Sequence, residues 1–265
     1  MPRPIRVEYF VEPDAAALTE RTARYFVDSI EGAVARRGRA RIAISGGGTP
    51  KPVFEALGDK SKPWRSRIDW DRLEIYWVDE RCVPPTDKAS NFKMTREALL
   101  GSVPMVAAQI HRMEGELDPE EAAARYESEL RDGFRLEGAE TPRFDLIQLG
   151  MGPDGHTASL FPHTEALHEL GRLAVANHTG AEQAWRLTLT LPVLVQGADV
   201  FFMVSGADKA RVIEEVLLGP RDPERLPSQL IRPANGILTL LLDREAAALL
   251  PAPDASGRGQ LELNS

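Results

Sequence analysis

The sequence predicts an α/β fold with a doubly wound, mostly parallel sheet that carries helices on both faces. Short apolar runs of strand length alternate along the chain with longer amphipathic segments of helical period. Many of the apolar runs end in glycine or small polar residues, as strands do before a crossover helix. We expect one α/β domain over residues 1–250. The proline- and glycine-bearing segment 251–265 is expected to be a disordered tail.

The first half of the chain opens with a strand and a long helix. Asp14 is a suitable N-cap for this helix, and Gly38 is a suitable stop. A short apolar strand then leads through a glycine-rich loop into the next helix. The pattern predicts strands at 6–11, 41–44 and 73–78, an extended segment at 110–113, and helices at 14–37, 52–57, 91–100 and 119–131.

The second half repeats the alternation. It predicts strands at 144–149, 173–176, 187–191, 199–204 and 236–242, and helical segments at 207–218, 227–230 and 245–250. Polar loops follow the strands that end at Ile44, Val78, Leu149 and Val204. Because open α/β sheets place ligands at the carboxyl ends of their strands, we expect these four loops to gather in one pocket.

Composition restricts the classes of partner. The net charge of -8 speaks against general binding to nucleic acid or to anionic membranes, although a pocket in an acidic protein can be locally positive. No apolar run approaches the ~20 residues of a membrane span, and the first residues do not resemble a signal peptide. Cys82 is the single cysteine, which excludes an internal disulfide and a multi-cysteine metal site. We expect a cytoplasmic protein that needs no cofactor and no metal.

The stretch 144–162 carries the strongest chemical pattern. A buried strand ends at Gly150 and Gly152, and polar residues follow in a row, among them Asp154 and His156. A histidine has an unperturbed pKa of about 6.5, so a neutral imidazole can accept a proton near neutral pH. Asp154 could orient this imidazole. The alternative is a histidine that merely hydrogen-bonds a turn; the polar surroundings favour a general base at His156.

The loop 45–50 is a candidate phosphate site. Gly46, Gly47 and Gly48 let backbone N–H groups approach an anion, and Thr49 adds a hydroxyl before a helix begins. The loop lacks the Gly-Lys-Ser/Thr ending of a nucleotide P-loop and the glycine spacing of a dinucleotide site. A small phosphorylated ligand therefore fits better than ATP or NAD. The alternative is a tight turn that needs unusual backbone angles.

Charged residues follow two further strands. Asp79, Glu80 and Arg81 are either a solvated strand end or part of a site, in which the Arg81 fork would suit a phosphate or an oxyanion. Lys209 lies in the expected first turn of a helix, where a cation is unfavourable unless an anion is near. A surface lysine is the alternative there. Cys82 has no neighbouring base and is expected to be a bystander.

Four motifs together resemble the soluble bacterial and eukaryotic 6-phosphogluconolactonases. They are SGGGTP (45–50), WVDERCVP (77–84) with Ser90 and Asn91, GMGPDGHTASLFP (150–162) and SGADKA (205–210). The resemblance implies the fold of glucosamine-6-phosphate deaminase and ribose-5-phosphate isomerase. It also implies metal-independent hydrolysis of 6-phospho-D-glucono-1,5-lactone in the pentose phosphate pathway.

Two other functions compete with this one. The related deaminases carry a motif that resembles DGHIAFNEP, whereas Leu160 and Phe161 stand here in place of its Asn-Glu pair. The missing carboxylate disfavours a deaminase-like isomerase. A non-catalytic sugar-phosphate-binding regulator usually carries a DNA-binding module, for which this sequence leaves no residues, and the intact His156 and Arg81 also weigh against it.

The resemblance suggests a role for each motif residue. His156 would remove a proton from water attacking C1, Arg81 would bind either the oxyanion or the phosphate, and Asp79 would hydrogen-bond His156 or Arg81 to orient it. Asn91 would bind a sugar hydroxyl, and Lys209 would neutralise the phosphate. The partner is a small phosphorylated lactone, and the oligomeric state stays open between a monomer and a weak homodimer. The residues expected to bind substrate are Gly46, Gly47, Gly48, Thr49, Asn91, Asp154 and Lys209.

Overall fold

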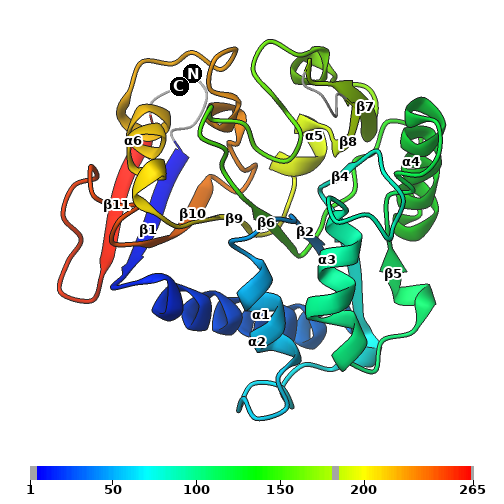
Figure 1. The fold of residues 1–265 in the computed structure, drawn as a ribbon, viewed down its shortest axis with the longest axis horizontal. Helices are drawn as coiled ribbons and strands as arrows, with labels where there is room; N and C mark the ends of the chain where they lie inside the picture. The colour runs from blue at the N-terminus through cyan, green and yellow to red at the C-terminus, as the bar shows by residue number, and fades with distance from the viewer. Residues whose placement is uncertain (1–4, 181–184, 264–265) are drawn as a thin grey trace.

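The fold is built on an eight-stranded sheet (Figure 1). The computed structural model describes residues 5–180 and 185–263. In the described residues β11 pairs antiparallel with β1, and the other pairings of this sheet are parallel. The strands, in spatial order, are β11 (Arg258–Leu263), β1 (Ile5–Glu12), β10 (Ile237–Asp243), β9 (Val200–Val204), β6 (Leu146–Leu149), β2 (Ala40–Ile44), β3 (Leu73–Trp77) and β5 (Ile110–His111).

Helices cover both faces of this sheet, as the sequence predicted. On one face lie α1 (Ala15–Arg37), α2 (Lys51–Gly58) and α3 (Asn91–Ala98), and on the other α4 (Pro119–Phe134), α5 (Leu191–Val195) and α6 (Ala210–Leu218). Alternate residues of each strand serve the two cores because side chains of a strand point to opposite faces. Ile42 and Ile44 pack with the first group of helices and Ala43 with the second. None of the described helices is long and apolar enough to cross a membrane.

The long helix α1 shows the predicted local signals at both ends. The Asp14 carboxylate accepts a hydrogen bond from the backbone N–H of Ala17 at 2.9 Å. Gly38 adopts a left-handed φ of 75° and donates its N–H to the Val34 carbonyl. The predicted span of this helix is therefore confirmed.

A second, three-stranded antiparallel sheet was not predicted. It has the order β4 (Asp79–Arg81), β8 (Trp185–Leu189) and β7 (Ala174–His178). Residues 79–81 were expected to be the charged end of one strand, but the chain leaves the large sheet at Val78 and enters the small one. A strand of three residues with two buried acids has no apolar pattern by which to recognise it.

Two segments near the carboxyl end also differ from the expectation. Residues 258–263, expected to be part of a disordered tail, form β11 against β1. Leu261 and Leu263 pack on the core, while Arg258, Gln260 and Glu262 of the same strand are exposed. These polar residues made the segment resemble a disordered tail by composition. Residues 245–250 form turns instead of a helix. Pro251 disfavours helical backbone at the residue before it, so it opposes a helix that continues to Leu250.

Candidate active site

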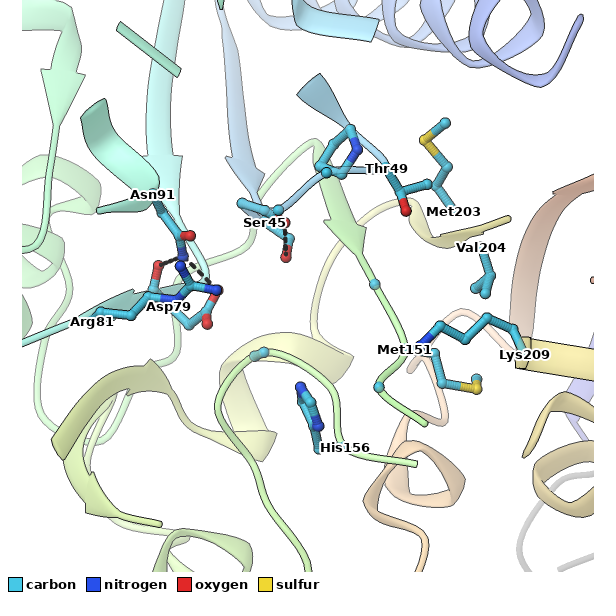
Figure 2. Close-up of a pocket in the computed structure, with 17 residues that line it drawn as sticks. Ser45, Thr49, Asp79, Arg81, Asn91, Met151, His156, Met203, Val204 and Lys209 are labelled. Carbon is cyan, nitrogen blue, oxygen red and sulfur yellow. Dashed lines mark hydrogen bonds between the residues drawn. The ribbon is translucent and has the colours of Figure 1, made fainter. Parts of the chain in front are cut away.

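The polar loops after β2, β3, β6 and β9 meet around one pocket at the carboxyl edge of the large sheet (Figure 2). Its volume is about 190 Å³. The structure brings together the residues predicted for catalysis and, apart from Asp154, those predicted for substrate binding. The lining residues are Ser45, Gly46, Gly47, Gly48, Thr49, Pro50, Asp79, Arg81, Asn91, Gly150, Met151, Gly152, His156, Ala158, Met203, Val204 and Lys209.

The glycine loop 45–50 needs its glycines for different reasons. A Cβ on Gly46 would lie 1.9 Å from Oδ1 of Asn91, so only glycine lets the loop approach this side chain. Gly47 has a φ of 108°, which other residues rarely adopt. A Cβ on Gly48 would meet nothing within 4 Å. The loop starts from a fixed point because Ser45 donates its backbone N–H to Oε1 of Gln148 on β6 at 2.9 Å.

His156 is oriented by its own loop. Its Nδ1 lies 2.6 Å from Oδ1 of Asp154, whose carboxylate also accepts the backbone N–H of His156. In the neutral imidazole this contact places the proton on Nδ1 and leaves a lone pair on Nε2. Nε2 makes no hydrogen bond within residues 5–180 and 185–263. Asp154 thus lies behind the imidazole and outside the pocket lining where a substrate ligand was expected.

Asp154 stays ionised to accept this bond. Partial burial raises the pKa of its carboxyl, but the hydrogen bonds from His156 outweigh burial, and the net pKa lies below the ordinary value. Gly152 makes the pair possible. A Cβ at this position would lie 2.1 Å from Nδ1 of His156 and 2.7 Å from Oδ1 of Asp154. Gly152 is therefore required because any side chain at this position would collide with the histidine.

The small sheet holds the loop that follows His156, and Ser159 is the point of attachment. Its hydroxyl donates to Oδ2 of Asp79 on β4 at 2.8 Å, and its N–H donates to Oγ1 of Thr188 on β8 at 3.2 Å. Its carbonyl accepts from Nδ2 of Asn177 on β7 at 2.8 Å. Ala158, just before it, has a left-handed φ of 48°, a conformation that persists only when its surroundings impose it. Each strand of the small sheet thus fixes this loop.

Asp79 does not have the partners that were predicted for it. Its carboxylate accepts from the Ser159 hydroxyl and, at 3.3 Å, from Nδ2 of Asn91. In the described part of the chain it hydrogen-bonds neither His156 nor Arg81. The cause is β4, whose pairing with β8 sets Asp79 beside the loop that carries Ser159. Asp79 is therefore connected to His156 indirectly, through the loop that carries both Ser159 and His156.

Arg81 is held at the pocket by Glu80, whose importance the sequence did not reveal. Glu80 is 3% exposed and accepts the N–H groups of Arg81, Asn91 and Phe92 and the hydroxyl of Ser90, at 2.7 to 3.0 Å. Burial raises the pKa of Glu80 above its ordinary value despite these bonds. The carboxylate ties β4 to the first turn of α3. The Arg81 guanidinium also donates to the Ala89 carbonyl.

Asn91 braces the pocket wall. Its Nδ2 donates to the backbone carbonyl of Asp79 at 2.9 Å, and its Oδ1 lies buried against Gly46 with no hydrogen-bond partner in the described residues. The side chain is 2% exposed. The geometry joins the glycine loop to Asp79, and a contact between Asn91 and a sugar hydroxyl stays a prediction.

Lys209 and Arg81 approach the pocket from opposite sides, with His156 between them (Figure 2). Lys209 lies in a short 3₁₀ turn, Ala207–Lys209, directly before α6. Its side chain is 19% exposed, and its Nζ lies 3.4 Å from the Asp208 carboxylate. The pocket therefore has a cation at each end and, between them, an imidazole nitrogen with no hydrogen-bond partner in the described part of the chain.

Cys82 lies next to Arg81 but has no reactive thiol. Burial raises the pKa of Cys82 to about 11, so the thiol stays protonated at neutral pH. In residues 5–180 and 185–263 no group of three or more histidine, cysteine, aspartate or glutamate side chains is arranged to hold a metal ion.

Known proteins share this sequence and fold. Residues 13–240 match the family model described as glucosamine-6-phosphate isomerases/6-phosphogluconolactonase. A 6-phosphogluconolactonase of Synechocystis sp. is 41% identical over 230 residues, which cover 86% of this chain and 92% of the relative. One of Mycobacterium tuberculosis is 36% identical over 248 residues, which cover 91% of this chain and 97% of the relative.

Solved structures agree with this match. The crystal structure of a devB protein has a TM-score of 0.82 at 32% identity and covers 92% of this chain and 100% of its own. The 6-phosphogluconolactonase from Trypanosoma cruzi has a TM-score of 0.77 at 27% identity and covers 91% and 96%. The predicted α/β fold with its mostly parallel sheet is confirmed.

Proposed function

We propose, since this chain belongs to the family of glucosamine-6-phosphate isomerases and 6-phosphogluconolactonases, that it hydrolyses 6-phospho-D-glucono-1,5-lactone to 6-phospho-D-gluconate in the pentose phosphate pathway. The observation that carries the proposal is the imidazole of His156. Its Nδ1 is held by Asp154, and its Nε2, which has no hydrogen-bond partner in the described residues, lies at the pocket between two cations. This arrangement suits a base that activates water beside an anionic substrate.

The reaction needs one base and one oxyanion stabiliser because a lactone is an activated ester. Nε2 of His156 takes a proton from the water that attacks C1, a step worth roughly 10² to 10⁴ in rate. The bond between C1 and the ring oxygen then breaks, and the imidazolium returns its proton to that oxygen. Arg81 lies on the far side of His156 from Lys209. This position favours Arg81 as the group that stabilises the negative charge developing on the carbonyl oxygen.

The phosphate belongs at the other end of the pocket. The backbone of Gly46 to Thr49 offers N–H groups, and Lys209 supplies a counter-charge. Tight binding of this remote group holds C1 against the water and so converts binding energy into orientation.

Packing at Phe161 favours hydrolysis over a deaminase-like isomerisation. Leu160 is fully buried, and the ring of Phe161 lies against His156. The two positions where the deaminase motif carries Asn and Glu are therefore apolar here. No carboxylate from these positions is available to assist ring opening of an amino sugar.

We further propose that the reaction is metal-independent and that the enzyme works in the cytoplasm without a nucleic-acid partner. The net charge of -8 opposes binding to nucleic acid. Activity should persist in excess EDTA, and its loss on chelation with recovery on adding a divalent cation would contradict metal independence.

The test is hydrolysis of lactone generated in place by glucose-6-phosphate dehydrogenase, measured against the spontaneous rate. Wild type should accelerate hydrolysis, and His156→Ala should lose roughly 10² to 10⁴ of kcat while it keeps its affinity for 6-phosphogluconate. His168→Ala is the matched control, because His168 is exposed and pairs with Glu224 outside the pocket. If folded wild type did not accelerate lactone hydrolysis above the spontaneous rate, the lactonase proposal would be wrong. Ammonia release from glucosamine 6-phosphate would then test the deaminase alternative, and product binding without either turnover would indicate a regulator.

A further inference from the structure

The ring of Phe161 stacks on the imidazole of His156. The two ring centroids are 4.1 Å apart and the planes differ by 25°. Phe161 is partly buried and is absent from the residues that line the pocket. It therefore contacts one face of the proposed base and does not enter the space where a substrate would bind.

The small sheet holds Phe161 in this place through its backbone. The Phe161 carbonyl accepts from the Thr164 hydroxyl at 2.8 Å, and the same hydroxyl accepts from Nδ2 of Asn177 on β7 at 3.1 Å. Left-handed backbone at Ala158 and His163, with φ of 48° and 59°, bounds the segment on both sides. Such conformations in residues other than glycine are retained where the surroundings over-determine them. The stack is thus imposed by the fold.

The stack fixes the plane of the imidazole, which the hydrogen bond to Asp154 alone does not. A hydrogen bond at Nδ1 leaves the imidazole free to tilt about that bond, since the χ2 torsion of histidine has a broad minimum. A ring against one face sets the plane of the imidazole and with it the direction of the Nε2 lone pair. When Nε2 takes a proton the imidazole becomes a cation, which the face of an aromatic ring attracts.

We propose that Phe161 is a positioning residue for His156: its ring sets the plane of the imidazole and stabilises the imidazolium formed during lactone hydrolysis. This inference rests on the proposed function, in which His156 is the base. A branched apolar side chain of similar bulk fills the space but lacks the flat π face, so the aromatic ring itself is required.

The experiment compares Phe161→Leu, Phe161→Tyr and Phe134→Leu. Phe134 is a partly buried ring that packs on Tyr76 and Phe144, away from the pocket. Phe161→Leu should lower kcat about tenfold with KM nearly unchanged, because orientation and the imidazolium both suffer. Phe161→Tyr should keep wild-type kcat, and Phe134→Leu should lose stability without losing kcat. In proton NMR the ring protons of His156 should be shifted upfield in wild type and Phe161→Tyr, and this shift should disappear in Phe161→Leu.

The outcomes separate the two proposals. Wild-type kcat in Phe161→Leu, or an equal loss in Phe161→Leu and Phe161→Tyr, would overturn the positioning role while the lactonase function stands. A wild type that shows the ring shift but does not accelerate lactone hydrolysis would overturn the proposed function, and with it a role defined by proton transfer at His156. The positioning role would be established if kcat falls in Phe161→Leu and is retained in Phe161→Tyr, and if the upfield shift of the His156 ring protons is lost and retained in the same two variants.

Discussion

The glycine loop 45–50 and the catalytic loop 156–164 form opposite walls of one pocket, yet they are held in different ways. The glycine loop depends mainly on its own glycines, the left-handed Gly47 and the Gly46 that packs against Asn91, and Gln148 anchors its first N–H at Ser45. The catalytic loop depends on Asp79, Thr188 and Asn177, which lie 80, 29 and 18 positions from the serine they bind. The first loop would bind substrate through its backbone, and the second carries the proposed base, His156, and is held by remote side chains.

The difference teaches where each function is encoded. A phosphate site built from consecutive backbone N–H groups is compact in sequence. Alignment of a base to a fraction of an ångström requires rigid support, which neighbours in sequence seldom provide. We therefore expect damage to the catalytic loop to lower kcat and damage to the phosphate end to raise KM.

Among changes that leave the His156 imidazole in place, Gly152→Ala should have the largest effect. The added Cβ would lie 2.1 Å from Nδ1 of His156, so the histidine and Asp154 must separate. A misplaced base costs about 10²-fold, and we expect a loss of that size in kcat with affinity for 6-phosphogluconate retained. Gly171→Ala is the control, because its Cβ would meet nothing nearer than Glu169 at 3.4 Å. Normal kcat in a folded Gly152→Ala would break the assignment of His156.

Lys209→Ala should act at the other end of the pocket. Loss of a charge-assisted contact to phosphate, typically worth about 1.5–3 kcal/mol, should raise KM for the lactone roughly 10- to 100-fold and leave kcat nearly unchanged. Steady-state kinetics with Lys60→Ala, an exposed lysine elsewhere, provides the reference. If kcat fell while KM stayed constant, Lys209 would belong to the reacting carbon and the division between the two ends would fail.

Asn177→Ala should weaken the attachment of the catalytic loop to the small sheet. The change removes the donor to the Ser159 carbonyl and the Thr164 hydroxyl, which costs about 1–3 kcal/mol of unfolding free energy for a buried group left unpaired. We expect kcat to fall roughly tenfold because the catalytic loop loosens, with KM changed less. Thermal denaturation and kinetics would check both. A stability loss without any change in kcat would show that the sheet supports the fold but not the base.

Cys82→Ala should have the smallest effect. The thiol lies beside Arg81, but its pKa of about 11 keeps it protonated and unreactive at neutral pH. We expect kcat and KM within about twofold of wild type, and slow alkylation of the native protein by iodoacetamide. Rapid alkylation that abolishes activity would place this thiol in the site and contradict its role as a bystander.

Much of the fold was readable from local patterns. The caps of α1, the order of strands and helices, and the gathering of four loops at one edge follow from periodicity, glycine and the geometry of parallel sheets. The sequence did not reveal β4 or the role of Glu80, because three charged residues in a row look like a solvated strand end. It also missed β11, whose polar residues outweighed two leucines that find a partner only on β1.

The sequence by itself determined the chemistry available: a histidine with a carboxylate two residues before it, a glycine loop before a helix, an arginine and a lysine after strands. Each of these is a property of a few adjacent residues. Only the tertiary structure decided how the proposed base is held. Asp79, Thr188 and Asn177 meet Ser159 through pairing of distant strands, and Phe161 meets His156 through a strained loop. The reason is physical. Local backbone preferences act within a turn or two, whereas contacts between distant strands form only when the whole chain has packed.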